Sequence, residues 1–307
     1  MHHSRHAATA CTWGKDGVPQ AEELFAVTTR SRLKGPWLFP AMMIASLRVR
    51  RQLATTGTVV RWASIVAGPS EFWTITVWKS RHDMQEFMRS GAHDDIMWLF
   101  SKWLRSFWLM RWRPGPDEVG RWKGITMSQP EPAYEKPPME TAKGEALQKA
   151  LDHLPRLKAA TAADGTLSYE SSPYARRSRA EVGGAGGLVV HLSTSVLDSF
   201  EALKALRALR REAQADPESL RTVLGFGKLG QVYLLCVWAD RDAARRLLES
   251  PRLAAAAKRW PDGCWANEWI PENEFGHWDG LRLRHGRQRY AIAVPSLARR
   301  AAELPER

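Results

Sequence analysis

The hydrophobic and polar positions of this chain follow strand and helix periodicities in an order that occurs twice. In residues 72–78, FWTITVW, alternate side chains face opposite ways, as they do in a strand. Residues 40–55 place apolar side chains at helical spacing among basic ones, which predicts an amphipathic helix. The elements predicted for the first half are a strand at 24–29, a helix at 40–55, strands at 59–68 and 72–78, a helix that begins after Ser80 with a break at 90–91, and a strand at 106–114. We expect Pro114 to end that last strand.

The second half repeats this order. Its predicted elements are a strand at 187–193, a helix at 199–214, strands at 220–228 and 231–238, a helical region at 242–260 and a strand at 264–271. Trp78 matches Trp238, and Ser90 matches Ser250, each at an offset of 160 residues (238 − 78 and 250 − 90). The sequence GRWKG at 120–124 is echoed by GHWDG at 276–280. Repetition over this length predicts a duplicated domain.

The order strand, helix, strand, strand, helix, strand is the ferredoxin-like βαββαβ pattern, so the predicted fold class is α+β. One face of such a sheet is left bare by its helices and must be buried elsewhere. Two bare faces on one chain predict an intramolecular dimeric α+β barrel. The expected organisation is a flexible N-terminal tail at 1–20, a first ferredoxin-like domain at 21–128, a Pro- and Gly-rich linker with one short helix at 129–186, a second ferredoxin-like domain at 187–284 and a C-terminal tail at 285–307.

Composition narrows the classes of function. The 307 residues suit two domains, and the net charge of +12 favours anionic partners, including a peripheral membrane contact. The basic residues are scattered and accompany no nucleic-acid-binding motif, so we expect no nucleic-acid partner. Three cysteines without CxxC spacing, no apolar leader and no long apolar stretch predict a cytoplasmic protein without a transmembrane helix. Ten of the 15 tryptophans precede residue 123, which indicates an aromatic-rich first half.

The segment ITVWKSRHDMQEFMRSGAHDDIM (75–97) resembles the strand–helix segment of the dimeric α+β-barrel superfamily, which includes antibiotic-biosynthesis and heme-degrading monooxygenases. A VWxS-type strand end paired with a closing GxWxG is most similar to spheroidene monooxygenases, which are carotenoid oxygenases. The motifs cover roughly 100 residues of each half by the domain bounds above. The resemblance implies oxygenase chemistry on a hydrophobic small molecule and, in the heme-degrading members, a heme cofactor.

Three residues are the candidate heme site. In heme-degrading relatives, a histidine on the helix after the VWxS strand is the axial ligand, and His93 lies in a similar place. Helical spacing puts Met97 and Phe100 on the same face, and we expect nearby tryptophans to line the cavity with them. The structural alternative is a histidine that bonds a backbone carbonyl near a helix start. Leu253 occupies the matching position of the second half, which predicts one heme per chain.

Thr28, Thr29 and His191 are the candidate catalytic residues. In several relatives the first strand carries a polar residue that contacts the substrate. His191 lies in the first strand of the second half, and Thr28 and Thr29 are taken as the corresponding polar positions of the first half. Side chains alternate along a strand, so only one of Thr28 and Thr29 can face any given cavity. A purely structural role through local hydrogen bonds stays open for all three.

Heme-dependent oxygenation is thus one of three functional hypotheses. The second is a cofactor-free oxygenase or cyclase of the antibiotic-biosynthesis type, and the third is a non-catalytic binder of apolar ligands. No reductase module is evident in the sequence, so a heme enzyme of this kind would need a separate electron donor. Further oligomerisation stays open, and no hydrolase or kinase motif is present.

Overall fold

The computed structural model describes residues 12–13, 19–20, 24–127, 176–181, 184–276, 278–279 and 281–284. The predicted tails and linker, including the short helix expected in the linker, lie mostly outside these residues. Two small strand pairs accompany the main body: β1 (Thr12–Trp13) with β2 (Pro19–Gln20), and β7 (Arg176–Glu181) with β12 (Leu281–Arg284). None of the helices described is long and apolar enough to cross a membrane.

The first half forms the predicted succession of elements. They are β3 (Phe25–Leu33), the short 3-10 helix η1 (Pro36–Leu38), α1 (Phe39–Thr55), β4 (Val59–Gly68), β5 (Glu71–Trp78), α2 (Arg81–Met88), α3 (Gly91–Trp103) and β6 (Leu104–Gly120). The expected helix break falls between α2 and α3, and Gly91 begins α3 with a positive φ of 58°. Ser80 begins α2 as its N-cap, where its hydroxyl accepts from the Asp83 backbone N–H at 3.2 Å.

The second half forms the same succession. Its elements are β8 (Gly186–Ser193), α5 (Ser199–Ala215), β9 (Ser219–Phe226), β10 (Gln231–Trp238), α6 (Arg241–Leu248), α7 (Pro251–Arg259) and β11 (Cys264–Gly276). The prediction that Pro114 ends its strand is wrong, because β6 continues to Gly120. The β6–β11 register shifts between Asn267 and Trp269, where Trp269 pairs with Pro114. A bulge of this kind accommodates a proline within a ladder.

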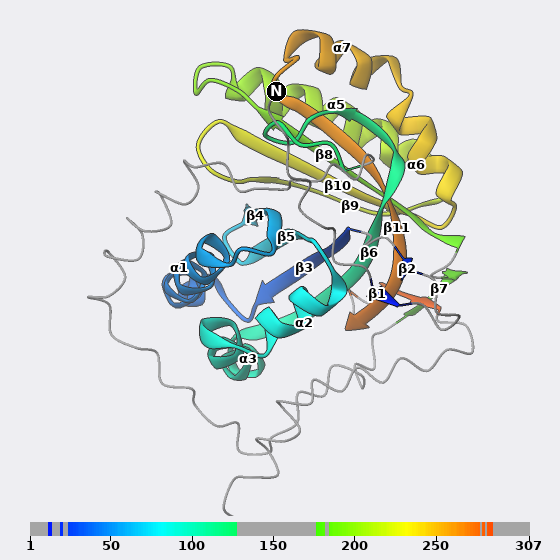
Figure 1. The fold of residues 1–307 in the computed structure, drawn as a ribbon. Helices are drawn as coiled ribbons and strands as arrows, with labels where there is room; N and C mark the ends of the chain where they lie inside the picture. The colour runs from blue at the N-terminus through cyan, green and yellow to red at the C-terminus, as the bar shows by residue number, and fades with distance from the viewer. Residues whose placement is uncertain are drawn as a thin grey trace, which may run out of the picture.

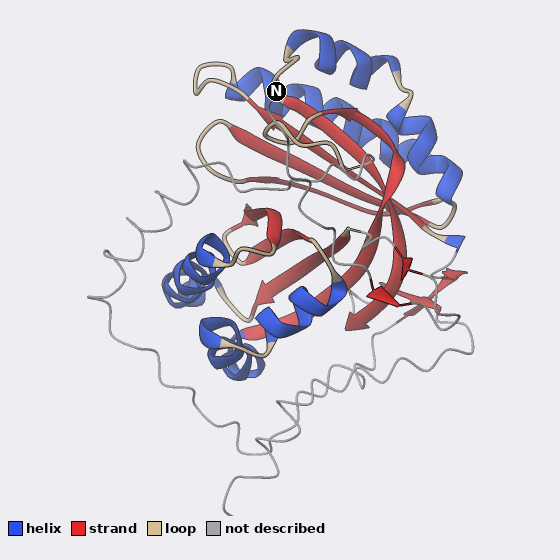
Figure 2. Cartoon of the chain, in the orientation of Figure 1, coloured by secondary structure: helices blue, strands red, loops and turns tan. Residues whose placement is uncertain are grey.

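Eight strands close into one barrel in the order β10-β8-β11-β6-β3-β5-β4-β9. Within each half the order is the ferredoxin-like one, β6-β3-β5-β4 and β11-β8-β10-β9. The halves join where β6 pairs with β11 and where β4 pairs with β9. Helices α1, α2 and α3 cover the outside of the first half, and α5, α6 and α7 cover the second (Figures 1 and 2). The fold is therefore α+β with a large antiparallel sheet, and the intramolecular barrel is formed.

The barrel interior is a packed core. Seven tryptophans from both halves share it: Trp73, Trp108, Trp112, Trp122, Trp265, Trp269 and Trp278. Their rings lie close together, with centroids 4.5 Å apart for Trp73 and Trp278. Two further apolar clusters lie between the sheet and the helices, one in each half. Four of the ten tryptophans of the first half thus fill the barrel together with three from the second half.

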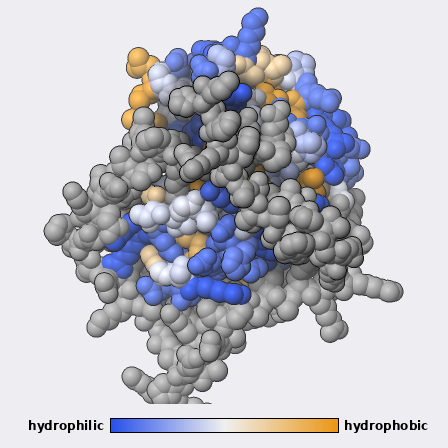
Figure 3. Space-filling model, in the orientation of Figure 1, coloured by the Kyte–Doolittle hydropathy of each residue, from blue (hydrophilic) through white to orange (hydrophobic). Residues whose placement is uncertain are grey.

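The outer surface seen in Figure 3 is mainly hydrophilic where its residues are described, with a few apolar side chains among the polar ones. Exposed apolar side chains include Val196, Leu197 and Phe200, which lie at the start of α5. Trp37, Phe226 and Leu229 are exposed as well, and the buried apolar residues gather in the barrel and under the helices. Most of the apolar surface that could contact an apolar ligand therefore lies inside the fold.

The two halves meet through reciprocal contacts along β6 and β11. Trp108 donates its indole N–H to Glu274 at 2.5 Å, and Trp265 donates to Glu118 at 2.5 Å. Each of these glutamates lies two residues before the first glycine of a GxWxG motif. Each half thus supplies one tryptophan and one glutamate, as in an isologous dimer interface.

Candidate functional site

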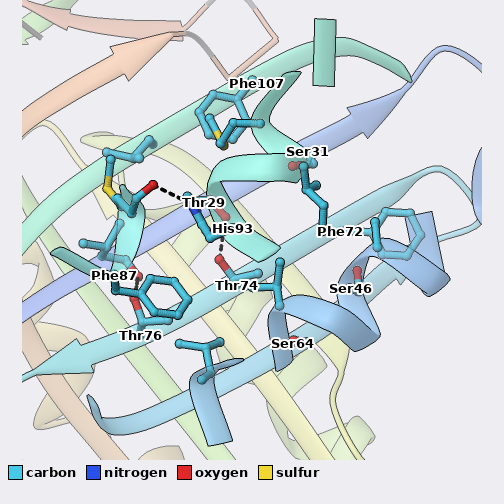
Figure 4. A pocket seen from close by; sticks show the side chains of 18 of the residues that line it. Thr29, Ser31, Ser46, Ser64, Phe72, Thr74, Thr76, Phe87, His93 and Phe107 are labelled. Carbon is cyan, nitrogen blue, oxygen red and sulfur yellow. Dashed lines mark hydrogen bonds between the residues drawn. The ribbon is translucent and has the colours of Figure 1, made fainter. Parts of the chain in front are cut away.

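A pocket lies between the helix-facing side of the first-half strands and the three helices above them. Its cavity volume is about 120 Å3. Strand residues form its floor: Val27, Thr29, Ser31, Ser64, Phe72, Thr74, Thr76, Trp78, Phe107 and Leu109. Helix residues form its roof: Met42, Ala45, Ser46, Val49, Leu53, Met84, Phe87, Met88, His93, Ile96 and Met97. The walls are largely apolar, as Figure 4 shows.

His93 lies in the first turn of α3 and is held there by two neighbouring elements. Its Nδ1 lies 3.2 Å from the carbonyl oxygen of Met88 on α2. Its backbone N–H donates to Oε1 of Gln52 at 2.8 Å, and the same amide donates from Nε2 to the carbonyl oxygen of Ser90 at 2.8 Å. Gln52 therefore joins α1 to the junction of α2 and α3. Because the contact to Met88 uses Nδ1, Nε2 is the ring nitrogen left for a ligand (Figure 4).

The surroundings of His93 keep its imidazole neutral at pH 7. Burial lowers the pKa of His93 below its usual range, against the opposing effects of the Met88 carbonyl and Asp94. The Phe87 ring lies 5.2 Å from the imidazole, centroid to centroid. A neutral imidazole with Nδ1–H donated to a carbonyl oxygen has a basic Nε2, which is the form that binds metals.

Hydroxyl groups line the strand side of the pocket. The Thr29 and Thr74 hydroxyls, on adjacent strands, lie 2.5 Å apart and share a hydrogen bond. Thr76 accepts from the Trp78 indole N–H at 2.9 Å. The pocket thus combines an apolar roof that carries one imidazole with a floor that presents several uncharged hydroxyls.

The predicted catalytic residues fall in two different places. Thr29 lines the pocket, whereas Thr28 points into the barrel and accepts from the Trp112 indole at 2.9 Å. His191 also lies inside the barrel, stacked on Tyr233 with centroids 4.4 Å apart. The structure therefore brings Thr29 together with His93 and Met97 at the pocket, and it does not bring Thr28 or His191 there. Phe100 belongs to α3, but its side chain lies outside the described part of the structure.

The strand registers correct the match between the two halves in their first strands. Arg30 pairs with Trp73, and His191 pairs with Tyr233, which makes Arg30 the counterpart of His191 at an offset of 161 (191 − 30). The expectation that Thr28 and Thr29 correspond to His191 was wrong, because the strand pairings place them two residues and one residue before its counterpart. Likewise, Trp78 is the only tryptophan that lines the pocket among those with described side chains. The expected aromatic walls lie in the barrel instead.

The counterpart of His191 is a fully buried cation with three partners. Arg30 donates to Glu71 at 2.7 Å, to Asp279 at 2.7 Å and to the Ser106 hydroxyl at 3.1 Å. With its donors satisfied, this guanidinium supports the barrel end and is not available to a ligand there. Within the described ranges, no group of three or more His, Cys, Asp or Glu side chains could hold a metal ion.

Several residues that line the pocket, and Gln52, which holds His93 in place, were not singled out from the sequence. Gln52 is separated from His93 by 41 residues and gives no local signal. The hydroxyls do give one, because Thr74 and Thr76 were predicted to share a strand face. A strand face covered by helices normally carries apolar side chains. The threonines on this face were therefore the feature of the sequence that could have indicated the pocket floor.

Neither a protein-family model nor a curated protein matches this chain. Among solved structures, a Fusobacterium nucleatum protein provisionally described as a monooxygenase is similar over 86% of this chain and 100% of its own, with 6% identity and a TM-score of 0.32. An aldoxime dehydratase in complex with butyraldoxime is similar over 82% of this chain and 80% of its own, with 11% identity and a TM-score of 0.45. An anthrone oxidase-like protein is similar over 85% of this chain and 97% of its own, with 10% identity and a TM-score of 0.29.

Proposed function

We propose that this chain is a monooxygenase-like oxidoreductase that acts on a hydrophobic small molecule in the first-half pocket, with heme held by His93. The observation that carries the proposal is the state of that histidine. It lines an apolar pocket, its Nδ1 is engaged by Met88, and its lowered pKa leaves Nε2 unprotonated. The nitrogen donor and the apolar walls fit what a heme requires. The lining offers no Lys or Arg to the two propionates, so these would have to lie outside the lining.

Heme at this position supplies an iron centre that activates oxygen or a peroxide. The chain's own residues do the rest of the work. Gln52 and Met88 fix the imidazole so that Nε2 stays available as a donor. Met84, Phe87 and Ile96 exclude water from the same space. The proposed heme enzyme would receive its electrons from a separate reductase protein. The proposed location of the chain is the cytoplasm.

The second half carries no equivalent donor. Leu253 stands where His93 stands in the first half, at an offset of 160 (253 − 93), and it is fully buried among apolar side chains. One heme per chain is therefore part of the proposal. We also propose that the halves arose by tandem duplication and that the motifs reflect kinship with carotenoid-type or secondary-metabolite oxygenases. The reciprocal tryptophan–glutamate bonds support the duplication.

The test is a hemin titration followed by absorbance. The parent protein should shift the Soret band and saturate at one equivalent of hemin per chain. His93→Leu, which installs the residue of the second half, should weaken binding by at least about 100-fold because the sole nitrogen ligand is lost. His82→Leu is the matched control, since His82 lies exposed on the neighbouring helix α2 and should bind hemin as the parent does.

Two outcomes would count against this function. Unchanged hemin binding by His93→Leu would remove His93 as the ligand. Absence of binding by the parent would favour a cofactor-free oxygenase or cyclase. That second candidate is favoured by one observation, the hydroxyl-bearing floor, which can position an oxygenated substrate without a metal.

A further inference from the structure

The two halves share the same arrangement of sheet and helices, so each pocket residue can be compared with its counterpart in the second half. Strands β5 and β10 correspond at an offset of 160, because Trp78 and Trp238 end them in equivalent pairings. Strands β3 and β8 correspond at 161, because Phe25 pairs with Trp78 and Gly186 with Trp238. Strands β4 and β9 also correspond at 160, because Ser64 pairs with Thr74 and Leu224 with Leu234. Helices α1 and α5 correspond at 160 by their bounds (199 − 39 and 215 − 55), so each polar residue considered below has an identifiable counterpart.

The counterparts of the pocket's polar residues are apolar throughout. Thr29, Ser31, Ser46, Ser64, Thr74 and Thr76 correspond to Val190, Leu192, Leu206, Leu224, Leu234 and Cys236. These counterparts all belong to, or pack against, one continuous apolar cluster between the second-half sheet and its helices. The same arrangement of sheet and helices thus forms without any of these hydroxyls.

Hydroxyl groups in such a place do not improve the packing of the sheet against its helices. Five of the six residues are half-buried and only Ser31 is buried, so they line an accessible pocket and do not lie within a packed core. A ligand that covers these hydroxyls removes their water, which costs free energy unless the ligand supplies hydrogen bonds in return. Thr29 and Thr74 bond each other, and Thr76 bonds Trp78 and the Val27 carbonyl. Among the described residues, the hydroxyls of Ser31, Ser46 and Ser64 show no protein partner. The polar set is therefore better explained by a ligand than by the fold.

The lining also defines the charge of that ligand. None of its 21 residues is Lys, Arg, Asp or Glu, so the lining holds no carboxylate, ammonium or guanidinium group that could pair with a charged ligand. An ionised group placed against this floor would lose its hydration without gaining a counter-charge. A pure hydrocarbon would leave the hydroxyls unpaired in a dry space.

We infer that the pocket selects an uncharged, largely apolar molecule whose hydroxyl or carbonyl oxygens face strands β3, β4 and β5. This inference names the substrate class for the pocket of the proposed function, and it rests on that function only in taking the ligand to be a substrate. The preference for uncharged oxygen-bearing ligands belongs to the hydroxyl floor and does not require heme.

Calorimetric titration of the full chain without hemin tests the inference, with 2-naphthol, naphthalene and 2-naphthoate as probes at pH 7. The parent should bind 2-naphthol about tenfold more tightly than either naphthalene or 2-naphthoate, the worth of one or two buried hydrogen bonds. The double variant Thr29→Val, Thr74→Val should reduce the preference over naphthalene to within about twofold. It should fold and unfold like the parent, because both partners of one hydrogen bond are replaced by side chains of the same shape.

Thr222→Val is the matched control. Thr222 lies on β9 in the second half, where it accepts from Arg210 at 3.0 Å, and it is remote from the pocket lining. This variant should keep the parent's preference. Equal affinity of the parent for naphthalene and 2-naphthol, or a preference that survives in the double variant, would overturn the inference. Hemin binding through His93 is measured separately, so either proposal can fail while the other stands.

Discussion

Acidification from pH 7 to pH 4.5 is expected to lower the free energy of unfolding by about 2.5 kcal/mol through His191 alone. Burial, with a smaller effect from Lys123, lowers the pKa of this imidazole from 6.5 to about 3. The unfolded chain therefore takes up a proton as pH falls through 6.5, while the folded protein does not. The contribution of neutral His191 to stability is fully present above pH 6.5 and is lost progressively between pH 6.5 and 3.

Urea unfolding at several pH values measures this dependence. His191→Phe should flatten the pH dependence by that amount, because a phenyl ring stacks on Tyr233 without titrating. Tyr233→Phe is the matched control, since it alters the same stack but keeps the imidazole, and its pH dependence should match that of the parent. The lowered pKa of His93 acts in the same direction, so some slope will remain in His191→Phe. Identical slopes in the parent and His191→Phe would show that His191 is not a buried neutral group.

The sequence predicted the succession of elements well, for a physical reason. Strand and helix periodicities depend only on residues that are close in sequence. Because the chain repeats, the same order of elements could be seen in both halves. The helix break near Gly91 and the Ser80 start of α2 likewise follow from local residues. Barrel closure followed from one argument, that a ferredoxin-like sheet has a bare face in need of a partner.

What the sequence did not predict was which side of the sheet each residue faces across the two halves. His191 was matched to Thr28 and Thr29, whereas the strand pairings make Arg30 its counterpart. Thr29 is one residue from that position and faces the opposite side of the sheet, because side chains alternate along a strand. The position of the pocket was hidden for a related reason. The tryptophans suggested a cavity, but only their registers show that they fill the barrel while the hydroxyl-bearing face lies under the helices.

Tertiary contacts across the chain also escaped local reasoning. The bond between Gln52 and His93 joins α1 to α3, and nothing in the sequence near either residue indicates it. The prediction for Pro114 failed for a different reason. A proline does disfavour a strand interior, but the register shift beside Trp269, on the neighbouring strand, allows β6 to continue past it. Sites assembled from separate elements are where sequence patterns carry least information.

The seam between the halves should be the part of the fold least tolerant of change, and Gly120→Ala is expected to lower the free energy of unfolding by about 3–4 kcal/mol. Gly120 has a φ of +71°, and it ends β6 opposite Trp265 of the other half. A Cβ there would lie closer than 3.0 Å to the backbone carbonyl oxygen of Cys264, so a strand of the second half would have to move. The cost combines a left-handed backbone with a backbone clash, which no side-chain rotation can relieve.

Gly124→Ala separates these two contributions within the same GRWKG motif. Gly124 has a φ of +84°, but a Cβ at this position would meet no atom within 4 Å, so only the backbone cost of roughly 1–2 kcal/mol should appear. Urea unfolding of both variants measures the difference. Because Gly276 meets the Phe107 carbonyl in the reciprocal arrangement, Gly276→Ala should match Gly120→Ala and not Gly124→Ala. Equal losses for Gly120→Ala and Gly124→Ala would mean that close approach of the two halves does not limit this position, and that the seam is looser than its reciprocal contacts imply.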